Sequence, residues 1–344
     1  MSKYKISVII PTYNSNEFLC SLFKSIKNQS MDFSEIQVIF VDDNSDEDYT
    51  INLLKSFDEE YENVKVVFLD KNDGFPGKGR NIGLDLSDGE YVIFSDHDDS
   101  YADDAFERMY DVAADEDADM LIANYYKVFP DKKVKVKTIF NGKNIIVNNF
   151  EEDLRLFYID PAIWTKLFKK KFLIDNNIRF LETMLAEDLF VYIASLVKSK
   201  SSVYLDDFYA YNYSIRNTDG DKSTIHIRNK KYLHKMVEGY YQVDKFLKDM
   251  GLERYFSDVF NRHFVYWISS LRDSKISFNQ KVELIEYASP LLKKQLKIKP
   301  GFGERLYQIL TKPILEDDYE KTVKYLSLIG KYHFASSKIK NILR

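Results

Sequence analysis

The chain has 344 residues, of which 45% are hydrophobic and 15% aromatic, so we expect a large packed core and no extensive disorder. The formal net charge of −5 argues against a general nucleic-acid-binding protein, because such proteins usually carry an excess of basic residues. Cys20 is the single cysteine, which excludes an intramolecular disulfide and suits a reducing compartment. We find no signal peptide and no apolar run near the roughly 20 residues that cross a bilayer. We therefore expect a cytoplasmic protein, with peripheral association at the inner face of the membrane left open.

The first part of the chain alternates short apolar runs with amphipathic stretches. Residues 17–29 carry apolar side chains at helical spacing. Four runs are rich in β-branched and apolar side chains on both faces, as parallel strands covered on both sides must be: 5–10, 36–41, 64–69 and 90–95. This order predicts an α/β fold with a mostly parallel, Rossmann-like sheet.

The later parts of the chain have different patterns. Residues 131–147, "DKKVKVKTIFNGKNIIV", predict a hairpin around Asn141-Gly142. From about residue 228 the spacing of apolar residues is helical to the end. We therefore expect an α/β domain over residues 1–227 and a helical region over 228–344. The helical region would bind a substrate, drive self-association into a homo-oligomer, or do both.

Each predicted strand leads into a group of polar residues. Ligands of open parallel sheets bind beyond the carboxyl ends of the strands, so we expect these groups to form one site. Tyr13 would offer an aromatic face to a base and Asp43 an acceptor for a base N–H. Arg80 would supply a charge for a diphosphate, whereas Asp96 and Asp98 would supply hard oxygens for a divalent cation. Such a cation makes the crowded carboxylates of "DHDD" tolerable. The alternative is that these acids only cap the helices that follow.

The glycines of "GKGRNIG" (77–83) resemble a dinucleotide-binding fingerprint. Their third glycine is one position late, and no strand directly precedes them, which argues against a nicotinamide-dependent dehydrogenase. The chain also lacks the G-x-x-x-x-G-K-[ST] pattern of a P-loop nucleotidase. We interpret the glycines as a flexible loop that lets Lys78 and Arg80 approach phosphates.

Taken in order, "SVIIPTYNS", "VDDNSDE", "GKGRNIGL", "GEYVIFSDHDD" and "LAEDLFVY" resemble the family 2 glycosyltransferases of the GT-A fold. The resemblance covers roughly residues 5–215 and implies a UDP-sugar donor with Mn²⁺ or Mg²⁺. It implies that uracil is held by three residues: Pro11, Tyr13 and Asp43. It further implies contacts to the nucleotide and its phosphates from two residues: Asn72 and Arg80.

The same resemblance gives roles to two acidic motifs. In "DHDD", Asp96 would touch the ribose or the sugar and Asp98 the metal, whereas His97 departs from the commoner small residue at that position. In "LAEDLF", inverting members of the family carry Glu187 and Asp188, with the aspartate as general base.

The case for Asp188 as a base also follows from chemistry. A sugar hydroxyl that attacks an anomeric carbon must lose its proton, and an ionised carboxylate within hydrogen-bond reach can take it. Residues 189–197 predict a helix, whose N-terminal dipole favours an ionised Asp188. The alternative is that Glu187 and Asp188 merely cap this helix.

A narrower likeness involves "GFPGKGRN", "IWTKLFKKKFLIDNNIRF" and "FNRHF". These stretches resemble β-N-acetylglucosaminyltransferases that decorate wall teichoic acid. The likeness implies UDP-N-acetylglucosamine as donor, the polyanion poly(ribitol phosphate) as acceptor, and a trimer formed through C-terminal regions. It gives four candidate contacts to the acceptor phosphates: Lys166, Lys169, Arg262 and His263.

Two alternatives stay open. One is a glycosyltransferase for a capsule, an exopolysaccharide or a lipid-linked oligosaccharide that uses another UDP-sugar. The other is a non-catalytic binding protein built on the same fold, although such a protein would need neither Asp98 nor Asp188.

Overall fold

The structure, a computed structural model, describes the following residues: 2–15, 17–216, 228–299, 302 and 305–342. The chain divides into two compact units. The first comprises residues 1–183 and 187–217, and the second comprises residues 184–186 and 218–344. The predicted boundary at residue 227 falls in segment 217–227, which lies outside the described residues.

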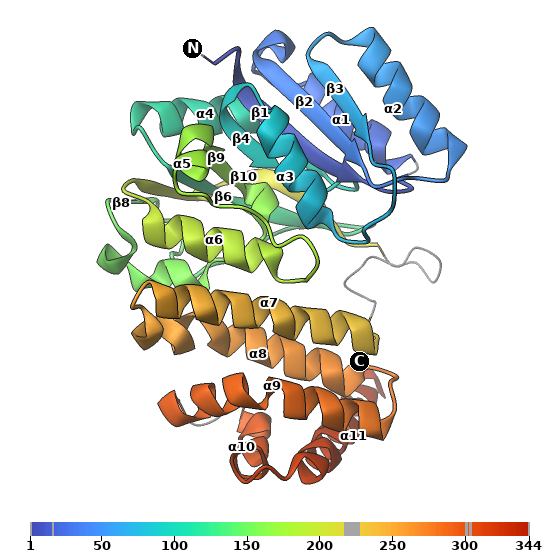
Figure 1. Ribbon diagram of the computed structural model, residues 1–344, viewed down its shortest axis with the longest axis vertical. Coiled ribbons are helices and arrows are strands. Elements are labelled where there is room, and N and C mark those ends of the chain that lie inside the picture. The colour runs from blue at the N-terminus through green and yellow to red at the C-terminus, as the bar shows by residue number, and fades with distance from the viewer. Residues whose placement is uncertain (1, 16, 217–227, 300–301, 303–304, 343–344) are drawn as a thin grey trace. The chain divides into compact units, whose positions relative to one another are not determined.

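The first unit contains a mixed sheet of ten strands. Eight of them follow one another in the order β3-β2-β1-β4-β9-β6-β10-β5 (Figure 1). Two more strands pair off this path, β7 with β6 and β8 with β10. The longest ladders, β1 with β2, β1 with β4, β2 with β3 and β6 with β10, are parallel. The strands are β1 (Tyr4–Thr12), β2 (Ile36–Asp42), β3 (Val64–Phe68), β4 (Gly89–Phe94), β5 (Ser100–Tyr101), β6 (Met120–Val128), β7 (Lys133–Lys135), β8 (Ile145–Val147), β9 (Lys166–Lys169) and β10 (Ser202–Ser214). The predicted, mostly parallel α/β architecture is confirmed.

Helices cover both faces of this sheet. They are α1 (Phe18–Lys27), α2 (Asp48–Glu60), α3 (Pro76–Leu86), α4 (Ala105–Asp115), α5 (Lys170–Asp175) and α6 (Glu187–Lys198). Helix α1 begins and ends close to the limits that its apolar spacing predicts, and it buries Leu22 and Ile26 in one core with Val8 of β1. Helix α3 packs on β1 and β2 from the other face, where Gly83 lies against Ile9.

Two predictions about the strands are wrong. Strand β3 forms one end of the sheet order and exposes 41% of Phe68, so it is not covered on both faces. The predicted hairpin does not form, because β7 pairs with β6 and β8 pairs with β10. Asn141 and Gly142 do have positive φ angles, 53° and 80°. The buried carboxylate of Asp206 accepts hydrogen bonds from Gly142 N and from the hydroxyl of Thr138, which ties this turn to β10.

The prediction of a flexible loop over residues 77–83 is also wrong. These residues lie in α3, which begins with a proline, a residue that suits the first turn of a helix. A Cβ atom on Gly77 would lie 2.2 Å from the carbonyl oxygen of Leu181, and one on Gly83 would lie 2.3 Å from Ile9 Cγ2. The glycines therefore let the helix approach its neighbours closely, and they do not make it flexible.

The second unit is helical, as predicted. Its helices are α7 (Lys230–Asp249), α8 (Phe256–Asp273), α9 (Phe278–Ile298), α10 (Thr311–Leu315) and α11 (Tyr319–Ile342). Helix α8 packs against both α7 and α9 (Figure 1), and the indole of Trp267 donates a hydrogen bond to the carbonyl of Leu233. Ser277 and Gln280 form a capping box that starts α9. Within the described residues, none of the helices has the length and apolar character needed to cross a membrane.

Candidate active site

The ends of β1 and β2 are locked together by buried polar groups. The carboxylate of Asp42 accepts hydrogen bonds from the hydroxyl of Thr12 at 2.9 Å and from Ser45 N at 2.8 Å. Asn14 has a positive φ angle of 45°, and its side-chain oxygen accepts from Asp46 N at 3.1 Å. These bonds hold the two segments that follow the strands in one fixed arrangement.

The predicted nucleotide-binding residues fall into this region. Tyr13 is 44% exposed and Asp43 is half-buried. The two carboxylate oxygens of Asp43 accept from the backbone of Asp73 at 2.9 Å and of Gly74 at 3.0 Å. Asn72 donates to the Asp43 carbonyl at 3.0 Å. The structure thus brings Asp43 and Asn72 together.

Pro11 and Lys78 flank the same segments. Pro11 is paired with Val41 of β2 and faces Gly79 of α3. The ammonium group of Lys78 lies 2.5 Å from a carboxylate oxygen of Asp73, and this hydrogen bond raises the pKa of Lys78. Lys78 is therefore bound to the loop that also holds Asp43.

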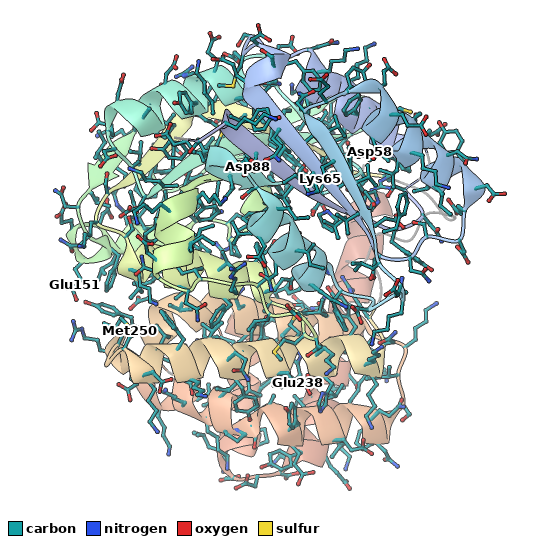
Figure 2. The ribbon with its side chains drawn as sticks, turned by 45° about the horizontal axis from the view of Figure 1, so that its top comes forward. Asp58, Lys65, Asp88, Glu151, Glu238 and Met250 are labelled. Atoms are coloured by element: carbon teal, nitrogen blue, oxygen red, sulfur yellow. The ribbon has the colours of Figure 1, made fainter. Side chains whose placement is uncertain are left out.

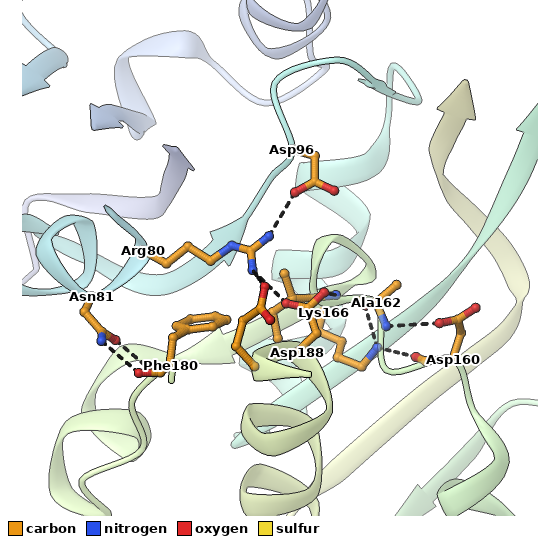
Figure 3. Close-up of polar contacts among 10 residues, drawn as sticks. Arg80, Asn81, Asp96, Asp160, Ala162, Lys166, Phe180 and Asp188 are labelled. Carbon is orange, nitrogen blue, oxygen red and sulfur yellow. Dashed lines mark hydrogen bonds and ion pairs between the residues drawn. The ribbon is translucent and has the colours of Figure 1, made fainter. Parts of the chain in front are cut away.

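Arg80 lies at the centre of three carboxylates (Figure 3). One terminal nitrogen is 2.7 Å from Asp188 Oδ1 and 3.2 Å from Glu187 Oε1, and the other is 2.9 Å from Asp96 Oδ1. The Arg80 side chain is only 3% exposed, and its guanidinium lies 5.2 Å from the centre of the Phe180 ring. Whereas the sequence predicts a phosphate contact, the structure shows a buried cation that connects the end of β4 to the start of α6.

Burial and the charge of Arg80 shift the pKa values of the carboxyl groups in this cluster in opposite directions. Burial raises the pKa of Glu187 to about 7, and the charge of Asp188 adds to this effect while Arg80 opposes it. Burial likewise raises the pKa of Asp188, again against the influence of Arg80. Burial works to lower the pKa of Arg80, but the three carboxylates outweigh it, so Arg80 stays charged.

Asp188 is the residue predicted as the general base. It is the second residue of α6, and this helix begins directly after Ala186, whose φ is 65°. Its second carboxylate oxygen is 3.4 Å from Ile163 N, and 28% of its side chain is exposed. This carboxylate can therefore be reached from solvent while Arg80 holds it in place.

The remaining acids of "DHDD" have separate partners. Asp98 forms an ion pair with Arg216, whose guanidinium lies 4.4 Å from the centre of the Phe18 ring. Asp99 is buried and accepts a hydrogen bond from Ser214 N at 2.7 Å, and burial raises its pKa to about 7. His97 is half-buried, and burial lowers its pKa, which favours a neutral ring at pH 7.

Sequence analysis missed Arg216. No local pattern marks it, because its pairing with Asp98 depends on β10 ending beside "DHDD". The bond between Ser214 N and Asp99 shows how the fold brings these distant segments together.

A divalent cation fits this site only together with a phosphate-bearing ligand. Within the part of the chain that the structure describes, no three His, Cys, Asp or Glu side chains are grouped to hold a metal ion. Asp96 and Asp98 are both partly exposed and present hard oxygens, but each is paired with an arginine. Mg²⁺ commonly binds through one or two carboxylates and completes its coordination with substrate phosphates and water, which two carboxylates can satisfy.

The structure contradicts one of the four predicted acceptor contacts, Lys166. Lys166 is fully buried, and its ammonium group donates to the carbonyls of Asp160 and Ala162, each at 2.7 Å (Figure 3). Its ammonium group is therefore not available to a polymer. Lys169 pairs with Asp117 and lies opposite Tyr91 on β4. Arg262 and His263 are half-buried on α8 of the second unit. The roles of Lys169, Arg262 and His263 stay predictions.

Several known proteins are similar to this chain in sequence. Residues 7–178, half of the chain, match the family model described as glycosyl transferase family 2. A poly(ribitol-phosphate) β-glucosyltransferase of Bacillus spizizenii is 31% identical over 223 residues, which are 64% of this chain and 34% of that protein. The poly(ribitol-phosphate) β-N-acetylglucosaminyltransferase TarP of Staphylococcus aureus is 32% identical over 209 residues, 60% of this chain and 62% of TarP. The chain thus spans only about a third of the first relative and less than two thirds of the second.

A solved structure shares the fold over nearly the whole chain. It is the crystal structure of S. aureus TarS 1–349 in complex with UDP-GlcNAc, with a TM-score of 0.69 and 22% sequence identity. The match covers 93% of this chain and 90% of that one. Together with the family match, this shows that the chain has the GT-A fold and belongs to glycosyl transferase family 2.

Proposed function

We propose that this protein is an inverting glycosyltransferase that transfers N-acetylglucosamine from UDP-N-acetylglucosamine to a hydroxyl group of a poly(ribitol phosphate) wall polymer. The observation that carries the proposal is the buried Arg80, which connects Asp96 with Asp188. The names of the two relatives support the acceptor, and the sugar nucleotide in the TarS crystal supports the donor.

In the proposed reaction Asp188 takes the proton of the acceptor hydroxyl. The hydroxyl oxygen attacks the anomeric carbon on the face opposite UDP, a new C–O bond forms, and the bond to UDP breaks with inversion. Arg80 keeps Asp188 ionised and fixes its orientation relative to Asp96. The donor nucleotide would be held by Tyr13, Asp43, Asn72 and Lys78, with Pro11 beside them. A Mn²⁺ or Mg²⁺ ion held by Asp98 and Asp96 would neutralise negative charge on the leaving diphosphate.

The proposal also covers the cellular location and the oligomeric state of the protein. UDP-sugars and an unfinished wall polymer would meet on the cytoplasmic side of the membrane, to which the protein would bind peripherally. The helical second unit would assemble a homotrimer, and light scattering of the full chain measures that state.

The donor sugar is tested by comparing UDP-sugars. The two relatives are named for different sugars, glucose and N-acetylglucosamine, so this choice is the sharpest test of the proposal. We expect kcat/KM for transfer to poly(ribitol phosphate) to be highest with UDP-N-acetylglucosamine among UDP-N-acetylglucosamine, UDP-glucose and UDP-galactose. A preference for UDP-glucose or UDP-galactose would contradict the sugar and leave the reaction class intact. An absence of transfer and of UDP binding with Mn²⁺ would favour a non-catalytic protein.

Asp98→Asn is expected to weaken UDP binding by about tenfold or more in the presence of Mn²⁺, because one of two hard oxygen ligands loses its charge. Without Mn²⁺ the variant and the unchanged protein should bind UDP equally. Isothermal calorimetry with and without Mn²⁺ measures both values. Asp115→Asn, at the exposed end of α4, removes the same charge elsewhere and should leave UDP binding unchanged. Equal binding by the Asp98 and Asp115 variants with Mn²⁺ would show that Asp98 holds no metal.

A further inference from the structure

A cluster of lysines lies on and beside β7. We call it the β7 lysine strip and define it as Lys132, Lys133, Lys135 and Lys137. All four side chains are exposed, and segment 127–137 contains Asp131 as its one acidic residue, in a chain whose net charge is negative. The four lysines form no ion pair with the residues that the structure describes. The strip is therefore a concentrated positive charge that the first unit does not neutralise.

Aromatic rings support the ammonium groups of the strip. Lys133 Nζ lies 4.0 Å from the centre of the Tyr126 ring, and Lys135 Nζ lies 4.7 Å from that of Tyr209. The two tyrosine rings are themselves 4.8 Å apart. Because Lys133 and Lys135 alternate along a strand, their side chains share one face of the sheet. Cation–π contacts hold these charges in place without cancelling them.

The strip lies close to the candidate active site within the same unit. Lys133 pairs with Val128 at the end of β6, and Val128 pairs with Ser214 at the end of β10. Strands β6 and β10 run side by side (Figure 1). Ser214 N donates to Asp99, next to the proposed metal ligand Asp98. Two strand spacings, about 10 Å, therefore separate the backbone of Lys133 from that of Ser214.

We propose that the β7 lysine strip binds the phosphate groups of the acceptor polymer, an inference that rests on the proposed function. Alternate residues of a strand are about 7 Å apart, so Lys133 and Lys135 suit successive phosphates of a chain better than one phosphate. The strip is an open surface, which suits a polymer that must move along it. A membrane-binding surface usually inserts large apolar side chains, whereas within segment 127–137 Val134 is the one large apolar side chain that is exposed.

The inference is tested with end-labelled poly(ribitol phosphate) and the full chain. Fluorescence anisotropy should show that Lys133→Gln/Lys135→Gln weakens binding by about tenfold, the usual scale for two exposed charge contacts. The remaining binding should depend less on salt concentration, because fewer charges take part. In transfer assays the KM for the polymer should rise with little change in kcat. UDP binding by the same preparation shows whether the variant is folded.

A matched control removes equal charge at the other end of the sheet. Lys55→Gln/Lys65→Gln changes exposed lysines on α2 and on β3 (Lys65 is labelled in Figure 2) and should leave polymer binding unchanged. The inference is overturned if both double variants lose binding equally, or if the β7 variant binds the polymer as tightly as the unchanged protein. It is also overturned if the unchanged protein binds anionic vesicles more tightly than it binds the polymer. These vesicles contain 30% phosphatidylglycerol, which gives roughly the charge density of an anionic membrane. Polymer binding through the strip without any sugar transfer would support the strip and contradict the proposed function.

Discussion

Asp188→Asn is expected to lower kcat by about 10²-fold or more while affinity for the UDP-sugar stays nearly unchanged. The substitution removes the proton acceptor but keeps an oxygen that can accept the hydrogen bond from Arg80. Transfer kinetics at saturating donor and calorimetry with UDP measure the two quantities. Glu187→Gln is the matched control in the neighbouring position, and we expect it to have a smaller effect on kcat.

The pH dependence of the unchanged enzyme tests the same assignment. A base must be ionised, and burial raises the pKa of Asp188, so kcat should fall with decreasing pH at a higher pH than an exposed aspartate would allow. Asp188→Asn should abolish this acid limb in its residual activity. Near-normal turnover in the Asp188 variant, or an unchanged acid limb, would show that another group is the base.

Arg80→Met is expected to lower the free energy of unfolding by about 3 kcal/mol at pH 8, because it leaves carboxylates without their buried cation. The loss should shrink towards pH 5.5. A carboxyl group whose pKa is higher in the folded than in the unfolded state favours folding while protonated, so its contribution is lost as pH rises through the folded value. That value is about 7 for Glu187 even with Arg80 present, and removing Arg80 should raise it further.

Chemical denaturation at the two pH values measures this effect. Arg179→Met serves as control, because Arg179 forms a partly exposed ion pair with Asp85 at 2.7 Å and its loss should cost about 1 kcal/mol or less at either pH. A pH-independent loss for Arg80→Met would show that Arg80 contributes through packing, for example against Phe180, and not through its charge.

Much of the fold follows from local patterns in the sequence. Strands such as β1 and β4 are continuous apolar runs, and α1 and α6 carry apolar stripes, so their existence and order are predictable without a structure. Parallel pairing then places the strand ends at one edge, which is why "DHDD" and Asp43 could be assigned to a common site. The helical nature of the second unit follows in the same way.

Contacts between distant segments decided the rest. Arg80 and Glu187 are separated by 107 positions, and only the tertiary structure shows that Arg80 pairs with carboxylates. The burial of Lys166, the pairing of Asp98 with Arg216 and the separate partners of β7 and β8 have the same origin. Local sequence determines which residues form a strand, a helix or an acidic turn, because those choices depend on near neighbours. The tertiary structure decides which charged groups pair and which lysine is buried. Burial carries a free energy of desolvation, and this depends on how distant segments pack together.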